Sequence, residues 1–161
     1  MTVVADTSPL NYLVQIDRAP ILPHLFGRVL MPEAVLTELQ HPTAPSAVRT
    51  FANALPDWIS VRKSRVAPNP ALAGLHPGER EAIQLALEEH ADLLLIDERA
   101  GARLATQHGL RAIGTLGILV RAAQAGLVTI DTALDRLRST DFRCTPELFE
   151  HARRMVSPNP S

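Results

Sequence analysis

Four carboxylates stand where an α/β fold would bring side chains to one edge of a sheet: Asp6, Glu38, Glu79 and Asp97. Asp6 directly follows the apolar run Val3-Val4-Ala5, and Asp97 directly follows Leu93-Leu94-Leu95-Ile96. Short, continuously apolar runs of this kind are typical of buried parallel strands. Because open α/β sheets bind their ligands at the carboxyl ends of the strands, we expect both aspartates to lie at a ligand site.

The two glutamates are predicted to lie on helices. Glu79 belongs to a helix over residues 77–87, in which apolar residues recur at the spacing of one buried face. Glu79 aligns with that face, whereas Glu81 points about 160° away from it and is expected to be solvated. Glu38 lies at the margin of the apolar arc of another helix, which has Pro32 at its predicted first position.

Each acid also has a purely structural explanation. Asp97 could serve only as the N-cap of the helix that follows it, and Glu79 could be a first-turn acid favoured by the helix dipole. Asp6 is expected to have no such role, because Pro9 takes the first helical position and makes Ser8 the predicted N-cap. Clustered carboxylates repel one another and are tolerated where a divalent cation neutralises them. Taken together, the four acids therefore predict a metal site.

The other residue types narrow the chemistry of that site. The histidines show neither an i, i+4 pair nor the adjacent glutamate base of zinc proteases. An oxygen-only ligand set selects Mg²⁺ or Mn²⁺. The glycines are isolated, which argues against a phosphate-binding loop, and Ser8 lacks the G-x-S-x-G context of a nucleophilic serine.

Length and composition indicate one globular domain. A chain of 161 residues is long enough for one core, which we expect over residues 1–156, with a frayed tail at 157–161. No apolar run approaches the roughly 18 residues of a membrane span, and no signal peptide is recognisable, so a cytoplasmic protein without membrane contact is expected. The lone Cys144 is interpreted as a partly buried apolar residue.

The overall charge limits how the protein could bind a polyanion. A formal net charge of −1 provides no broad basic field, so any nucleic acid must be held locally. Only Lys63 among the basic residues is a lysine, and the planar fork of arginine suits phosphate geometry.

Strand and helix signals alternate along the chain, which predicts an α/β fold: a three-layer sandwich with a central parallel sheet flanked by helices. The predicted strands cover residues 2–5, 28–31, 58–61, 93–96 and 111–113. The predicted helices cover residues 9–16, 19–26, 32–39, 47–54, 77–87, 98–108, 116–125, 132–139 and 146–155. The proline-containing stretch 62–76 is predicted to be a loop.

Several short motifs, in this order, resemble those of PIN-domain nucleases, in particular the DUF3368 branch related to VapC-type toxins. The resemblance runs from about residue 2 to residue 140, and the gap of 18 positions from Glu79 to Asp97 adds to its specificity. The motifs are Val4-Ala5-Asp6-Thr7-Ser8-Pro9-Leu10, Val35-Leu36-Thr37-Glu38-Leu39, Gly78-Glu79-Arg80-Glu81-Ala82-Ile83, Leu95-Ile96-Asp97-Glu98-Arg99 and Gly114-Thr115-Leu116-Gly117.

The resemblance implies a PIN-like fold and a Mg²⁺- or Mn²⁺-dependent ribonuclease. It implies that the four acids hold the metal and that Glu98 adds a further acid. It also implies supporting roles for the hydroxyl residues Thr7, Ser8 and Thr115. Glu79 stands where many toxin relatives have Asp. The same resemblance implies an RNA substrate, a toxin role with a cognate antitoxin, and a homodimer.

Two other functions remain open at this point. One is a PIN-scaffold protein that binds nucleic acid or acts as an adaptor without turnover, against which the intact acid set argues. The other is a metal-dependent phosphatase acting on small phosphate esters.

Overall fold

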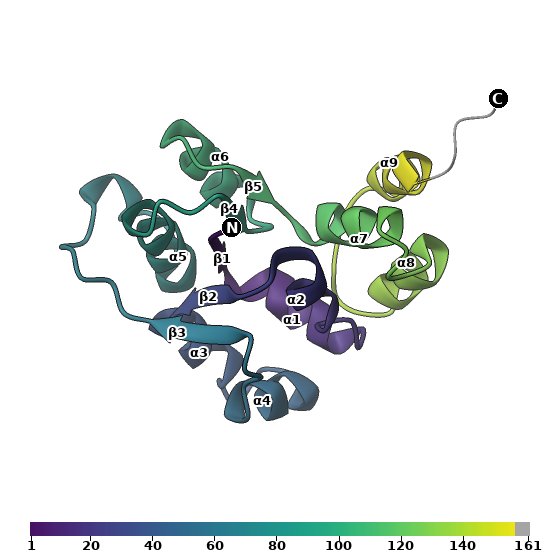
Figure 1. Cartoon of the computed structure of the whole chain (residues 1–161), viewed down its shortest axis with the longest axis horizontal. Coiled ribbons are helices and arrows are strands. Elements are labelled where there is room, and N and C mark those ends of the chain that lie inside the picture. Colours follow the sequence, from purple (N-terminus) through teal and green to yellow (C-terminus); the bar gives the residue numbers. More distant parts are fainter. Residues whose placement is uncertain (157–161) are drawn as a thin grey trace.

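The computed structural model describes residues 1–156, which are built around one five-stranded parallel sheet (Figure 1). The predicted tail at 157–161 lies outside the described residues. The strands are β1 (Val3–Ala5), β2 (Val29–Pro32), β3 (Ile59–Arg62), β4 (Leu93–Leu95) and β5 (Ala112–Ile113). The helices are α1 (Thr7–Gln15), α2 (Ile21–Phe26), α3 (Glu33–Leu39), α4 (Ser46–Asn53), α5 (Pro77–Glu88), α6 (Arg99–Gln107), α7 (Thr115–Gln124), α8 (Ile130–Arg138) and α9 (Pro146–Val156), with a short 3₁₀ turn at Pro70–Leu72.

The strand order is β3-β2-β1-β4-β5, and every neighbouring pair is parallel. The chain therefore winds outward from β1 to β3 on one side and then returns to place β4 against the other side of β1. In the register of this central pair, Val3, Val4 and Ala5 stand opposite Leu93, Leu94 and Leu95. The winding direction thus changes between β1 and β4, which is where open α/β sheets form a crevice at their carboxyl edge.

Alternate strand residues face two separate cores, because successive side chains of a strand point to opposite faces. Val4 and Leu94 pack with α5 and α6, whereas Val3, Ala5 and Leu95 pack with α1, α2 and α7. Figure 1 shows α5 and α6 on one side of the sheet, α1, α2 and α7 on the other, and α8 and α9 outside α7. The predicted three-layer α/β sandwich with a central parallel sheet is confirmed.

The structure corrects three local predictions. Helix α1 begins at Thr7, so Asp6 and not Ser8 occupies the N-cap position, although the Asp6 side chain makes no capping hydrogen bond. Pro32 keeps an extended backbone, with ψ of 160°, and precedes helix α3 instead of opening it. The segment 62–76 is not entirely loop, because Asn69 caps the 3₁₀ turn by accepting a hydrogen bond from the amide of Ala71.

A buried glutamine, which the apolar pattern of α5 does not reveal, fixes the loop that leads into this helix. The amide nitrogen of Gln84 donates to the carbonyl oxygens of Val66 (3.1 Å) and Ala67 (3.0 Å), and its side-chain oxygen accepts from the amide of Asn69 (3.2 Å). The side chain is 7% exposed. Buried polar groups are stable only when they are paired, so this one side chain holds the loop against α5.

No helix within the described residues 1–156 is long and apolar enough to cross a membrane.

We expect Gln84→Glu to lower the free energy of unfolding by about 3 kcal/mol, because it replaces the donor to Ser64, Val66 and Ala67 by a charged acceptor. Thermal unfolding measures the change, and hydrogen exchange should rise in residues 64–69. The matched control is Gln124→Glu, since Gln124 also donates to a backbone carbonyl, that of Met155, but at an exposed position. Equal melting temperatures for the two variants would contradict the role given to Gln84.

Candidate metal and nuclease site

Two of the four acids lie at the carboxyl edge of the sheet, on the two strands that flank the change in winding. Asp6 follows β1, and its backbone amide donates to the carbonyl of Leu95 at 2.8 Å. Asp97 follows β4 by two residues, and the intervening Ile96 donates its amide to the carbonyl of Ile113 on β5. The sheet itself therefore brings Asp6 and Asp97 to the same edge, on neighbouring strands.

Asp6 is the most deeply buried acid of the group. It is 3% exposed, and its Oδ1 has no hydrogen-bond partner among the described residues. The pKa of Asp6 is raised to about 7: burial is the largest cause, and the charges of Glu79, Glu38 and Asp97 add to it, against a lowering contribution from the hydrogen bond of the Thr7 amide. Because all three other acids act on it, Asp6 is the electrostatic centre of the group.

Asp97 is held by the start of helix α7 and does not cap the helix that follows it. Its Oδ1 accepts from the Thr115 amide and its Oδ2 from the Thr115 hydroxyl, both at 2.7 Å. Burial raises the pKa of Asp97, and these two hydrogen bonds oppose the rise. A Cβ on Gly114 would lie 2.6 Å from Oδ1, so only glycine lets the chain pass this close to the carboxylate. The N-cap of α6 is Glu98 instead.

Glu38, in the last turn of α3, reaches the first turns of two other helices. Its Oε2 accepts from the Thr7 hydroxyl, and its Oε1 accepts from the Gly78 amide at 3.0 Å. A Cβ on Gly78 would lie 2.6 Å from both carboxylate oxygens. Glu38 therefore connects α1, which follows Asp6, with α5, which carries Glu79.

Glu79 lies in the first turn of α5 and is 9% exposed. Burial raises its pKa, and the charges of Glu98 and Glu38 raise it further, against a lowering contribution from His76. Its Oε2 would lie 3.3 Å from a Cβ on Gly101, which places this carboxylate against α6. The charge of Glu98 thus acts on the group, although Glu98 itself is exposed.

The supporting hydroxyls differ in what they contact. Thr7 and Thr115 donate to Glu38 and Asp97, whereas the half-buried Ser8 makes no side-chain hydrogen bond to an acid within residues 1–156. Glu81 is half-buried, whereas its helical position predicted a solvated side chain. Cys144 is partly buried, as expected.

The sequence patterns missed the close packing of glycine against carboxylate. Gly78 stands next to Glu38, Gly101 next to Glu79, and Gly114 next to Asp97. These glycines look isolated in the sequence, because each one packs against an acid from a different segment. One sequence pattern could have indicated this packing: Gly78 directly precedes the candidate ligand Glu79, and Gly114 directly precedes the supporting residue Thr115.

The donor chemistry of the group fits a hard divalent cation, although the part of the chain that the structure describes holds no preformed set of three or more acid, histidine or cysteine ligands around one point. The donors are carboxylate oxygens, which suit Mg²⁺ or Mn²⁺. The unpartnered buried Oδ1 of Asp6 is a polar atom that a cation would satisfy. Mutual repulsion of the acids is a physical reason for the open arrangement, since like charges in one site disfavour each other.

In metal-free protein, Asp6→Asn should stabilise the fold at about pH 8 and have little effect at about pH 4. Folding raises the pKa of this carboxyl from 3.8 to about 7, so the cost of ionising it grows as the pH rises through that window and is complete above it. We expect the free energy of unfolding to rise by on the order of 1–3 kcal/mol at the higher pH. This is less than the pKa shift of Asp6 alone implies, because the new amide also needs a hydrogen-bond partner.

The measurement is urea unfolding in EDTA at both pH values, with the exposed Asp57→Asn as the control. The same stability difference between Asp6→Asn and wild type at the two pH values would contradict the buried charge at Asp6.

Comparison with known proteins agrees with this fold. The sequence matches the family DUF3368, described as a PIN domain, over residues 2–158. Comparison with curated proteins finds no match. Among solved structures, a PilT N-terminus domain protein from the hyperthermophilic archaeon Sulfolobus solfataricus P2 is similar at 18% sequence identity and a TM-score of 0.54, covering 76% of this chain and 93% of that chain. This structural likeness shows the fold alone. The family match shows that the chain belongs to DUF3368, a family of PIN domains, whose fold is of the nuclease type.

Proposed function

We propose that the protein is a metal-dependent endoribonuclease that hydrolyses RNA phosphodiester bonds. The observation that carries the proposal is the buried Asp6, with an unpartnered oxygen and a pKa raised to about 7, in electrostatic contact with three further acids at the carboxyl edge of the sheet. Strongly perturbed carboxyl groups in a crevice are typical of functional sites. PIN domains typically use divalent metal ions, which agrees with an oxygen-only donor set.

In this proposal Asp6, Glu38, Glu79 and Asp97 hold Mg²⁺ or Mn²⁺, with Glu98 as an additional acid. When bound, such an ion lowers the pKa of a water molecule and neutralises charge on the scissile phosphate.

The chain's own contribution is to orient the acids. The Thr7 hydroxyl and the Gly78 amide fix Glu38, and Thr115 fixes both oxygens of Asp97. Ser8 remains a proposed support beside Asp6. Hydrogen bonds to metal-binding carboxylates commonly determine their orientation and their affinity for the metal.

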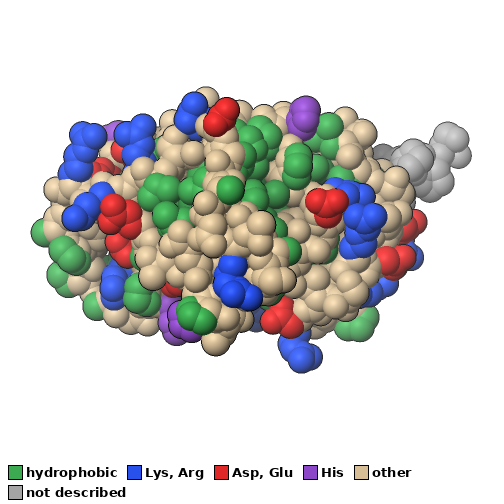
Figure 2. Space-filling model, turned by 90° about the horizontal axis from the view of Figure 1, so that it is seen from below, with side chains coloured by type: hydrophobic (Ala, Val, Ile, Leu, Met, Phe, Trp, Pro, Cys, Tyr) green, Lys and Arg blue, Asp and Glu red, His purple; other side chains and the backbone are tan. Residues whose placement is uncertain are grey.

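The substrate is proposed to be held close to the acids, because a net charge of −1 gives the chain no overall basic field. The face in Figure 2 shows acidic and basic side chains interspersed around a central area of hydrophobic side chains. We propose that single-stranded RNA binds along the crevice through a few local contacts.

We further propose that the protein is the toxin of a toxin–antitoxin pair and forms a homodimer. The support is the resemblance of its motifs to the branch related to VapC-type toxins. A short neighbouring gene that encodes a DNA-binding protein would support this role, and co-purification of its product would test the pairing directly.

Purified protein should cleave single-stranded RNA in the presence of Mg²⁺ or Mn²⁺, and cleavage should stop when EDTA is added. Attack by water in line with the departing 3′ oxygen leaves 5′-phosphate and 3′-hydroxyl ends, which end-labelling detects. Activity in EDTA that leaves 2′,3′-cyclic phosphate ends would contradict the proposal. Nitrophenyl phosphate is offered beside the RNA. Hydrolysis of nitrophenyl phosphate without cleavage of RNA would indicate a phosphatase, and binding of RNA without cleavage would indicate a non-catalytic adaptor.

Asp6→Asn and Asp97→Asn should each lower kcat/KM by more than about 100-fold, and Thr115→Val by about 10- to 100-fold, since it removes only an orienting hydrogen bond. Circular dichroism checks that each variant folds. The matched control is Glu81→Gln on α5, whose side chain makes no hydrogen bond or ion pair within the described residues. A loss in Glu81→Gln equal to that in Asp97→Asn would show that the acids have been assigned wrongly.

A further inference from the structure

A hollow of about 360 Å³ opens directly at Asp97. Its walls come from the residues after β4 and β5, the first turn of α7, the loop 139–145 and the first turn of α9. The volume lies at the lower end of the range of roughly 300–1,000 Å³ that small-ligand pockets occupy. One lining residue of this hollow, Asp97, is therefore a proposed metal ligand. Most of the other lining residues come from the C-terminal part of the domain.

Part of the wall is apolar and exposed. Leu116, Phe142 and Leu148 line it, and Leu148 is 45% exposed. Phe142 is held in place by edge-on contacts with Tyr12 and Phe149, at centroid distances of 5.0 and 6.3 Å. A rigid apolar wall beside a charged group suits the flat face of a nucleobase.

Two arginines, Arg99 and Arg143, complete the hollow. Both are exposed, and neither guanidinium forms an ion pair within residues 1–156. The guanidinium of Arg138, by contrast, already has partners: it pairs with Asp135 and lies 4.5 Å from the centroid of the Phe149 ring. Arg99 and Arg143 are therefore available to a phosphate, which guanidinium groups bind through paired hydrogen bonds.

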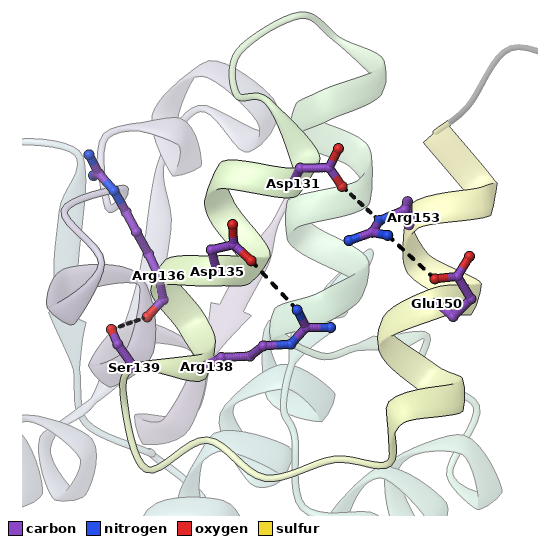
Figure 3. Close-up of polar contacts among 7 residues, drawn as sticks. All are labelled: Asp131, Asp135, Arg136, Arg138, Ser139, Glu150 and Arg153. Atoms are coloured by element: carbon purple, nitrogen blue, oxygen red, sulfur yellow. Dashed lines mark hydrogen bonds and ion pairs between the residues drawn. The ribbon is translucent and has the colours of Figure 1, made fainter.

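The loop that carries Arg143 is anchored at several points. The Thr140 hydroxyl donates to the carbonyl of Leu137 at 2.6 Å and accepts from the Phe142 amide at 3.1 Å. The helices on either side of the loop are joined by the ion pair between Arg153 and Asp131, at 2.7 Å (Figure 3). The backbone directly before Arg143 is thus anchored through Thr140 and Phe142.

We propose that this hollow binds the nucleotide of single-stranded RNA next to the scissile phosphate, which would lie at the cation held by Asp97 and the other acids. Its base lies against the apolar wall, and Arg99 and Arg143 pair with its phosphate. The proposal rests on the function proposed above and assigns to that function a substrate subsite.

A second hollow, of about 670 Å³, opens at Glu38 and is also lined by Thr7, His41 and His76. No arginine or lysine among the described residues lines it, so the fixed positive charge lies on the Asp97 side. The two hollows thus differ in the charge they offer to the strand on either side of the acids.

The first test measures the affinity of a fluorescent single-stranded RNA by anisotropy in the Asp6→Asn background with Mn²⁺, so that the RNA is not consumed. Arg99→Gln and Arg143→Gln should each weaken binding about tenfold. Each should also reduce the slope of log affinity against log salt concentration by about 0.7, the effect of one lost phosphate contact on a single strand. The control is the exposed Arg154→Gln on α9, which lies outside the hollow and should change neither quantity. Unchanged affinity and slope in both hollow variants would overturn the proposal.

The second test uses Cys144, which lines the hollow and is the only cysteine of the chain. Bound RNA should slow its reaction with a small thiol reagent severalfold, whereas RNA added to the Arg143→Gln variant at the same concentration should protect it less. RNA that binds by anisotropy but leaves the reaction rate unchanged would place the strand elsewhere and overturn this subsite alone. Absence of any RNA binding by the wild type would overturn the ribonuclease proposal together with it.

Discussion

The structure depends on one constraint: a carboxylate is buried where the sheet changes its direction of winding. Asp6 is 3% exposed, leaves one oxygen unpartnered among the described residues, and has a pKa raised to about 7 by burial and by three neighbouring acids. A fold stabilised only by its contacts would gain from a neutral residue at this position, because an unpaired buried charge is costly. Such a cost is explained if the group has a function, because strongly perturbed carboxyl groups cluster at functional sites.

The surrounding residues keep the acids in place against their own repulsion. Thr115 donates to both oxygens of Asp97, while Thr7 and Gly78 donate to the two oxygens of Glu38. Glycines let the backbone approach these carboxylates more closely than any other residue would allow. The acids are thus oriented by α1, α5 and α7 without forming a closed ligand shell, which is consistent with a site that a divalent cation would complete.

The sequence predicted the features of the candidate site that depend on local residue patterns and on position within a strand. Apolar runs that end in Asp6 and Asp97 placed both residues at the carboxyl edge, and the helical spacing around Glu79 placed it on a buried face. Local pattern failed where a residue's partner is distant in the chain. The rule that Pro9 follows a capping residue favoured Ser8 as the N-cap and Pro9 as the first helical residue, yet the helix starts two residues earlier, at Thr7. The apolar period of α5 gave no reason to bury Gln84, whose partners lie 15 to 20 residues away. The hollow at Asp97 is lined by three separate stretches of the chain, 97–99, 114–117 and 142–148, and no spacing in the sequence predicts that they meet.

Direct titration of metal-free protein with Mn²⁺ by calorimetry tests the central claim, which is that the carboxylates around Asp6 form one cation site. Wild type and Glu81→Gln should bind with the same affinity, and Asp6→Asn should bind about 10- to 100-fold more weakly, because it removes the negative charge of the buried carboxylate whose Oδ1 has no partner among the described residues. Equal Mn²⁺ affinity in wild type and Asp6→Asn, or no binding by the wild type at all, would contradict the account.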